Sequence, residues 1–247
     1  MTSHPEIMLE AKQVTLSDPL GLTEILQALS VQLKQRDRAI ILGPSGSGKT
    51  SLLRLFNRLS EPTTGSLFLK GTPYNKIPVL SLRKQIVLVP QEPKLLGMTV
   101  KEALAYPLSL QQLSQPEINT RITTYCEQLQ IPESWFDKNE LQLSLGQRQL
   151  VTIARGLIMQ PEVLLLDEPT SALDIGLATK VIEFLKIQEM TILMVNHQLD
   201  IAEQFSDRVL FLKQGKLTKD IPNLNLDWQE LKQEIIETEK QIEQEWN

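Results

Sequence analysis

The chain has 247 residues, of which 41% are hydrophobic and 22% charged, an ordinary composition for a globular protein. Its length fits one large domain, or a core that carries an inserted subdomain. No apolar run exceeds four residues, whereas a membrane-crossing helix needs about 20, so the composition excludes a membrane-spanning protein. Residues 1–9 lack the basic and apolar regions of a secretory signal, so we expect the chain to stay inside the cell.

The net charge of -5 is concentrated at the C-terminal end of the chain. Residues 227–247 hold seven acidic residues and two lysines, which accounts for the whole net charge and leaves residues 1–226 neutral. A neutral body has no basic stripe for a phosphate backbone, so nucleic acid is a poor candidate partner. Cys126 is the only cysteine, which excludes an internal disulfide and a cysteine-rich metal site, and we expect a partly buried side chain without a functional role.

Alternating apolar and polar residues near the start of the chain are typical of half-buried strands. Ile7–Val14 and Leu29–Leu33 show this alternation, and Leu67–Leu69 lies between two glycines. These segments predict an antiparallel sheet that flanks the core.

Five unbroken apolar runs predict the strands of a parallel sheet, because strands that are covered on both faces have no polar side. Periodicity alone leaves buried helices as the alternative. The runs are Ala39–Leu42, Ile86–Val89, Val163–Leu166, Ile192–Val195 and Val209–Leu212.

Polar or glycine-rich segments follow the first four of these runs, at residues 43–50, 90–91, 167–169 and 196–197. In open α/β sheets, ligands bind beyond the carboxyl ends of the strands. We therefore expect the four segments to converge on one site. Residues 213–216, after the fifth run, predict an ordinary hairpin turn.

Helix-compatible sequence fills the long interval between the second and third runs. Three such stretches are Val100–Ala105, Glu117–Leu129 and Gln147–Met159. They predict a helical subdomain at about residues 92–160, inserted in a domain that spans residues 1–220.

The acidic tail, residues 221–247, predicts an amphipathic C-terminal helix for which Asp227 is the N-cap. Its acidic face disfavours binding to an anionic membrane surface. The apolar stripe could pack against its own core or a second copy, or dock another protein. The stripe consists of Trp228, Leu231, Ile235, Ile242 and Trp246.

Residues 43–50 read Gly-Pro-Ser-Gly-Ser-Gly-Lys-Thr, which is the spacing of a phosphate-binding loop. Glycines let the backbone N–H groups point inward, and a helix predicted from about Lys49 to Leu59 directs its positive end at the same point. Lys49 would reach the β- and γ-phosphates of a nucleotide, and Thr50 would ligate Mg²⁺. A glycine-rich turn without a ligand is the alternative.

Two carboxylates end the third run and supply what a phosphate loop needs. Asp167 could hold Mg²⁺, and Glu168 is placed to polarise a water that attacks the γ-phosphate. A purely structural pair, which caps a helix that begins after Pro169, is the alternative.

Two further positions take their meaning from this context. Ser144 is a candidate N-cap of a helix that runs to about Met159, and Gly146 leaves the backbone N–H groups of its first turn exposed to an anion. Taken alone, this is an ordinary capped helix. His197, taken alone, is more often a core histidine than a catalytic one.

In their order and spacing, these elements resemble the ATP-binding cassette (ABC) family from roughly Ile7 to Lys219. The resemblance implies a fold of class α/β, with a P-loop core, a flanking antiparallel β subdomain and an inserted helical subdomain. The matching motifs are Walker A at Gly43–Thr50, the Q-loop at Gln91, the signature at Leu143–Gln147, Walker B at Val163–Glu168, the D-loop at Ser171–Asp174 and the switch histidine at His197.

The resemblance also implies the site and its mechanism. Two cassettes would pack head to tail, with each signature helix closing over the nucleotide held by the other copy. Glu168, His197, Gln91 and Lys49 would be catalytic, with His197 bonded to the γ-phosphate and Gln91 at the hinge of the helical insert. The implied ATP-binding residues are Gly43, Pro44, Ser45, Gly46, Ser47, Gly48, Lys49, Thr50, Ser51, Ser144, Gly146, Gln147 and Asp174, and the implied Mg²⁺ ligands are Thr50, Gln91 and Asp167.

The chain departs from the family pattern in two places. Leu145 stands where the commonest signature has a glycine, although Ser144 and Gly146 remain. Residues 10–22 also lack the aromatic side chain that stacks on adenine in the family, so Leu16 or Leu20 would offer only an aliphatic contact. The choice of adenine over guanine is therefore less firmly predicted than phosphate binding.

Three functions could use such a cassette. The first is the ATPase subunit of a transporter, docked at residues 92–107 to a separate integral membrane permease and thus peripheral on the cytoplasmic face of the membrane. A soluble cassette that acts on DNA or ribosomes would carry long coiled-coil insertions or two cassettes, and this chain has neither. A small-molecule kinase would leave the signature, the D-loop and His197 unexplained.

The cargo is indicated only by short similarities. Lys101–Leu108 and Leu129–Phe136 resemble a cassette group associated with bacterial iron export and plant aluminium tolerance. Metal export is therefore one prediction, and phosphate or amino-acid import and lipid transport stay open.

Overall fold

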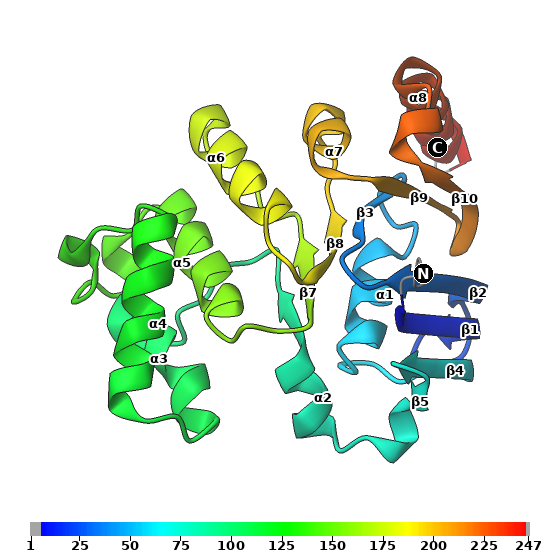
Figure 1. Ribbon diagram of the computed structural model, residues 1–247. Coiled ribbons are helices and arrows are strands. Elements are labelled where there is room, and N and C mark those ends of the chain that lie inside the picture. The colour runs from blue at the N-terminus through cyan, green and yellow to red at the C-terminus, as the bar shows by residue number, and fades with distance from the viewer. Residues whose placement is uncertain (1–5, 246–247) are drawn as a thin grey trace, which may run out of the picture.

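Six strands form the central sheet of the computed structural model, which describes residues 6–245 (Figure 1). Their order is β10-β9-β3-β8-β7-β6, and all neighbours are parallel except the hairpin of β9 and β10. All five apolar runs lie in parallel strands, as predicted. The strands are β3 (Arg38–Leu42), β6 (Ile86–Val89), β7 (Val163–Asp167), β8 (Thr191–Val195), β9 (Arg208–Lys213) and β10 (Lys216–Pro222).

A second, antiparallel sheet lies beside the first, as the alternating segments predicted (Figure 1). Its order is β2-β1-β4-β5, and Ala11 of β1 pairs with Val31 on one side and Leu67 on the other. The strands are β1 (Ile7–Ser17), β2 (Glu24–Lys34), β4 (Thr64–Leu69) and β5 (Thr72–Pro73).

Alternation along each central strand divides the core into two apolar clusters. Ala39 and Ile41 of β3 face one cluster, while Ile40 and Leu42 face the other. Helix α1 (Lys49–Phe56) fills the first cluster and lies between the two sheets (Figure 1). Burial of apolar side chains on both sides therefore fixes the helix that leads away from the phosphate loop.

Helix α1 is shorter than the predicted span to Leu59. Arg58 adopts a left-handed backbone with φ 58°, which ends the helix. Its guanidinium donates to the carbonyl oxygens of Tyr74 and Ile77, both at 3.0 Å. These bonds anchor the turn after α1 to the segment that follows the antiparallel sheet.

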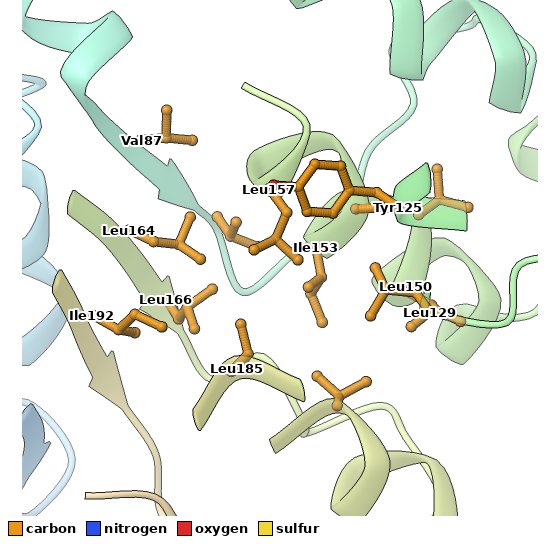
Figure 2. Close-up of a cluster of buried hydrophobic side chains, with 14 of the residues drawn as sticks. Val87, Tyr125, Leu129, Leu150, Ile153, Leu157, Leu164, Leu166, Leu185 and Ile192 are labelled. Carbon is orange, nitrogen blue, oxygen red and sulfur yellow. The ribbon is translucent and has the colours of Figure 1, made fainter. Parts of the chain in front are cut away.

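The second cluster lies on the opposite face of the central sheet, under the remaining long helices. Figure 2 shows Ile153 and Leu157 of α5 beside Leu164 and Leu166 of β7. A Cβ on Gly156 would lie 2.7 Å from Cγ2 of Val89, so this glycine lets α5 approach β6 closely. The helices on this face include α5 (Leu145–Leu157), α6 (Ile175–Lys186), α7 (Leu199–Phe205) and α8 (Trp228–Glu245).

The helical insert shares this second cluster with the sheet. Tyr125 and Leu129, at the end of α4, belong to the same cluster as β7 (Figure 2). At the start of α3, Thr99 and Glu102 form a reciprocal capping box. The remaining helices are α2 (Val79–Gln85), α3 (Val100–Leu110) and α4 (Gln115–Gln128), with short 3-10 turns at Tyr74–Lys76, Glu133–Trp135, Glu140–Gln142 and Asn223–Asn225.

The helix that follows Pro169, α6, begins at Ile175. Asp174 caps it, with its Oδ1 accepting from the Leu177 N–H at 2.9 Å. Residues 168–174 are consequently a turn rather than a helix.

Helix α8 follows β10 and packs against the second cluster. Asp227 Oδ1 accepts from the N–H groups of Gln229 and Glu230, as expected of an N-cap. Leu231 is buried, and Trp228 and Ile235 pack partly against the cluster. The Ile242 side chain and Trp246, the last two members of the predicted stripe, lie outside what the structure describes. Within residues 6–245, no helix has the length and apolarity that crossing a membrane requires.

Burial of Cys126 generates a test of this fold. The thiol is buried in the second cluster, and burial raises its pKa to about 11. At pH 8, only on the order of 0.1% of such a thiol is thiolate, the reactive form. We expect a thiol reagent to label the native protein very slowly at pH 8 and to label it at once in urea. Rapid labelling of the native protein would contradict the packing of α4.

Candidate active site

The phosphate loop owes its path to glycines at two close approaches. Gly43 has φ 146°, and a Cβ there would lie 2.0 Å from the carbonyl oxygen of Leu212 in β9. Gly48 has φ 101°, and a Cβ there would lie 2.9 Å from the carbonyl oxygen of Ile25 in β2. Both positions therefore need glycine. The loop is clamped between the central and the antiparallel sheet.

Two side chains inside this loop are suited to a phosphate. The buried Lys49 ammonium donates to the carbonyl oxygens of Gly43 and Pro44, at 2.8 and 2.7 Å. The Ser47 hydroxyl is buried, and no hydrogen-bond partner for it occurs among residues 6–245. A buried hydroxyl without a partner costs free energy. An anion in the loop would satisfy it, so the residues present fit a bound phosphate group.

The turn after β9 is more than the ordinary hairpin that the sequence indicated. Gly215 donates its N–H to the Ser47 carbonyl oxygen at 3.1 Å, and its own carbonyl accepts from the Gln27 N–H at 2.9 Å. A Cβ on Gly215 would lie 2.6 Å from the carbonyl oxygen of Ile25. The turn therefore holds the phosphate loop against β2.

Oxygen ligands for a divalent cation meet at the start of α1 and the end of β7. The Thr50 hydroxyl donates to Asp167 Oδ1 at 3.1 Å. Burial raises the pKa of Asp167, and the neighbouring Glu168 charge raises it further, whereas the bond from Thr50 lowers it. A hydroxyl beside a buried carboxylate is a set of oxygen ligands of the kind that Mg²⁺ prefers.

Glu168 is the point at which three segments of the site meet. One carboxylate oxygen accepts from Gln91 Nε2 at 2.9 Å, and the other lies 2.9 Å from His197 Nε2. The Glu168 backbone is left-handed, with φ 48°, and its N–H donates to the Val195 carbonyl oxygen at 2.9 Å. A non-glycine residue in this conformation is strained, so the surrounding structure has to hold it in place. The structure thus brings together Gln91, Glu168 and His197, with Gln91 hydrogen-bonded to Glu168.

A buried polar network behind His197 was missed by the sequence reasoning. Asn196 Nδ2 donates to the Thr170 hydroxyl at 2.8 Å, and that hydroxyl donates to Gln198 Oε1 at 3.2 Å. The Gln198 N–H in turn donates to Asn196 Oδ1 at 2.9 Å. These bonds fix the loop that presents His197. The signal was an asparagine at the end of an apolar strand, which has to find partners once it is buried.

The signature segment is built as a capped helix start. The Ser144 hydroxyl accepts from the Gln147 N–H at 3.2 Å, and Gln147 Oε1 accepts from the Ser144 N–H at 2.9 Å. A Cβ on Gly146 would lie 2.8 Å from the carbonyl oxygen of Ala172. Leu145, the departure from the family pattern, is half exposed. Gln147 and Asp174 both serve as helix caps here.

The signature and the phosphate loop belong to opposite faces of the central sheet. Helix α1, at the phosphate loop, packs in the first cluster, whereas α5, at the signature, packs in the second (Figure 1). A signature on the far face of the sheet is poorly placed to reach the phosphate loop of its own chain.

The two leucines expected near a nucleobase have different surroundings. Leu16 packs against the first cluster, whereas Leu20 is 79% exposed at the tip of the hairpin between β1 and β2. Leu20 is therefore the one of the two that is free to contact a base.

Comparison with known proteins identifies the family of the chain. The family described as ABC transporter matches residues 26–171. The glutamine transport ATP-binding protein GlnQ of Bacillus subtilis is 36% identical over 203 residues, 79% of this chain and 84% of its own length. The histidine/lysine/arginine/ornithine transport ATP-binding protein HisP of Escherichia coli is 35% identical over 225 residues, 84% of this chain and 88% of its own.

A solved structure shares the architecture. The dimeric bacterial ABC transporter cassette MJ0796 superposes with a TM-score of 0.81 at 29% identity, over 87% of this chain and 99% of that one. The same fold thus recurs in a known cassette. The chain belongs to the ABC transporter family, as one of its ATP-hydrolysing cassettes.

Proposed function

We propose that the chain hydrolyses ATP at an interface between two copies of itself and thereby drives transport through a separate membrane permease. The observation that carries the proposal is the Glu168 carboxylate, which is reached by Gln91 on one oxygen and by His197 on the other. A carboxylate at the end of β7, beside Asp167 and held by two polar side chains, is suited to orient an attacking water.

Each group in the site has a separate role in this reaction. Lys49 exchanges its two loop carbonyls for the β- and γ-phosphate oxygens, and the glycine-rich backbone receives the remaining phosphate charge. Thr50 and Asp167, with Gln91, would hold Mg²⁺, which neutralises charge on the β- and γ-phosphate oxygens when it is bound. Glu168 takes the proton of the attacking water as the new bond to phosphorus forms and the bond to ADP breaks.

Gln91 and His197 report the presence of the γ-phosphate. Both lie on Glu168, so a nucleotide and its attacking water compete with them for that carboxylate. His197 then transfers its hydrogen bond to the γ-phosphate, and Gln91 turns to the cation or to the water. Loss of the γ-phosphate returns both side chains to Glu168.

A second copy completes the site because the signature and α1 lie on opposite faces of the sheet. In a head-to-tail pair, Ser144 and Gly146 of one copy approach the γ-phosphate that the other copy holds. The exposed Ser144 hydroxyl and the first turn of α5 would supply the hydrogen bonds. The dimeric state of the cassette MJ0796 supports pairing between two copies.

Import of an amino acid is the transport that we favour. GlnQ carries the name of a glutamine transporter and HisP that of a histidine, lysine, arginine and ornithine transporter. Both relatives match about four fifths of this chain, whereas the similarity to metal-export cassettes depended on two short stretches. In this proposal the cassette binds the inner face of the membrane through its permease, docked at residues 92–107.

Replacing Glu168 tests the hydrolytic step. We expect Glu168→Gln to bind ATP and to lose hydrolysis by about 10² to 10³-fold, since the amide cannot accept the proton of water. Because ATP stays bound, the dimer should accumulate, and its molar mass can be measured by size exclusion with light scattering. A monomeric variant with full activity would contradict the role of Glu168.

Replacing Ser144 tests closure between copies. Ser144→Arg should leave ATP binding to the monomer unchanged and abolish ATP-dependent dimers in the Glu168→Gln chain, because an arginine fills the space for the γ-phosphate. Ser109→Arg, which adds the same side chain at an exposed position on α3, should change neither ATP binding nor ATP-dependent dimerisation. Normal turnover by Ser144→Arg would argue against closure in trans.

Recovery from membranes tests the partner and the cargo. We expect the tagged chain to co-purify with an integral membrane protein from its native cells, and cells that lack the chain to lose uptake of one amino acid. Co-purification with ribosomes or DNA would refute the transport role. Loss of metal efflux with normal amino-acid uptake would refute import and support the metal-export prediction.

A further inference from the structure

A single carboxylate links the segment after Gln91 to the signature helix. Glu140 lies in the 3-10 turn Glu140–Gln142, directly before the signature. Its Oε2 accepts from the Leu95 N–H at 3.1 Å, and its Oε1 accepts from Arg148 Nη1 at 3.2 Å. Leu95 is fully buried in the second cluster, and Arg148 is two residues beyond Gly146 on α5. Glu140 therefore joins Leu95 to Arg148, two residues that are distant from each other in the sequence.

Within residues 6–245, Glu140 is the one hydrogen-bond acceptor for the Arg148 guanidinium. The Nε of Arg148 is buried there without a hydrogen-bond partner. Only about a quarter of each of the two side chains is exposed, 27% for Glu140 and 26% for Arg148. A charge-assisted bond in such surroundings is stronger and more directional than one on the open surface. The orientation of Arg148 thus depends on Glu140.

A second arginine ties the same loop to the same helix. Arg155, two turns further along α5, donates through Nη1 to the carbonyl oxygen of Lys94 at 2.9 Å. Burial lowers the pKa of Arg155, and the charge of Glu140 acts in the opposite direction. Glu140 therefore also stabilises the guanidinium that holds Lys94. Consecutive residues of the loop, 94 and 95, are both fastened to α5.

The other end of this loop is the catalytic carboxylate. Gln91 lies three residues before Lys94 and donates to Glu168 at 2.9 Å. A short path consequently joins Glu168 to the signature helix. It runs from Glu168 by a hydrogen bond to Gln91 and along the backbone to Leu95. From Leu95 it continues by hydrogen bonds to Glu140 and then to Arg148. A change at Glu168 that displaces Gln91 has a direct mechanical path to the first turn of α5.

We propose that Glu140 is a positioning residue that keeps the signature helix in register with the Gln91 segment. It does not touch nucleotide. It makes the N-terminus of α5 move with the loop, so that Ser144 and Gly146 are presented to the second copy only when Gln91 has left Glu168. The inference rests on the proposed function in one respect, that the signature of one copy serves the nucleotide of the other.

Spin labels across the link test this proposal directly. Leu96 and Leu141 are exposed, at 65% and 95%, and they flank the two ends of the Glu140 link. Cysteines at these positions can carry the labels, with the buried Cys126 replaced by alanine if it reacts. We expect a narrow distance distribution in the parent and one about twofold broader with Glu140→Ala, because only the bond from Arg155 to Lys94 then ties the loop to α5.

Dimerisation supplies the functional readout. In the Glu168→Gln chain, adding Glu140→Ala should raise the ATP concentration for half dimerisation about tenfold, within the usual range for coupled sites. ATP binding to the monomer should not change, whereas a general loss of structure would weaken it. Glu133→Ala removes the same charge from a neighbouring 3-10 turn and should leave the spin-label distances and the dimer unchanged.

Two further variants keep the test decisive if Glu140→Ala does not fold. Glu140→Gln retains an acceptor for the Leu95 N–H but directs an amide N–H at Arg148, and Arg148→Met removes the helix side of the link alone. Each should broaden the distances and weaken dimerisation. Distances as narrow as in the parent, or an unchanged ATP requirement, would overturn the proposal. If the Glu168→Gln chain alone forms no dimer, the proposed function fails, while the spin-label distances still decide the role of Glu140.

Discussion

The Glu168 carboxylate is the constraint on which the rest of the site depends. It stands at the end of β7 on a left-handed backbone, a conformation that costs on the order of 1 to 3 kcal/mol for a non-glycine residue. The bond from its N–H to Val195 and the packing of β7 between two strands hold it there. Because Gln91 reaches one oxygen and His197 the other, any molecule that binds this carboxylate comes into direct contact with those two side chains. Chemistry at one residue is thereby coupled to two loops.

The alternation of side chains along the central strands determines where each half of the site can lie. Neighbouring residues of a strand point to opposite faces, so Leu165 of β7 faces α1 while Leu164 and Leu166 face α5. The phosphate loop and the signature are each fixed by the helix that follows them, and these helices are on different sides of the sheet. A single subunit therefore holds the two halves of the proposed site apart, and pairing between copies is the arrangement that unites them.

Sequence reasoning succeeded where one residue type has one physical use. Unbroken apolar runs identified the five parallel strands, and Gly43 and Gly48 of the phosphate loop occupy positions where a Cβ would clash with Leu212 or Ile25. It failed where the determinant is a contact between distant segments. The role of Gly215 depends on Ser47 and Gln27, and the end of α1 depends on the bonds of Arg58 to the segment after β5. The sequence analysis also did not identify Asp174 as the N-cap of α6.

The chemistry of the contacts separates the parts of the molecule that stay fixed from those that can move. Helix α1 and the second half of α5, with Ile153 and Leu157, are held to the sheet by close-packed apolar side chains, which tolerate little displacement without opening cavities. The first turn of α5, with the half-exposed Leu145, is less tightly packed. The Gln91 segment has one apolar anchor, Leu95, and is otherwise joined to the site and to the signature through hydrogen bonds of Gln91, Glu140 and Arg155. Such bonds are directional, but their polar groups can exchange partners with water or with a nucleotide at small net cost. In the proposed function, the signature is presented in one state and withdrawn in another. Polar links between Glu168 and α5 permit this change, whereas a continuous apolar contact there would hold a single arrangement.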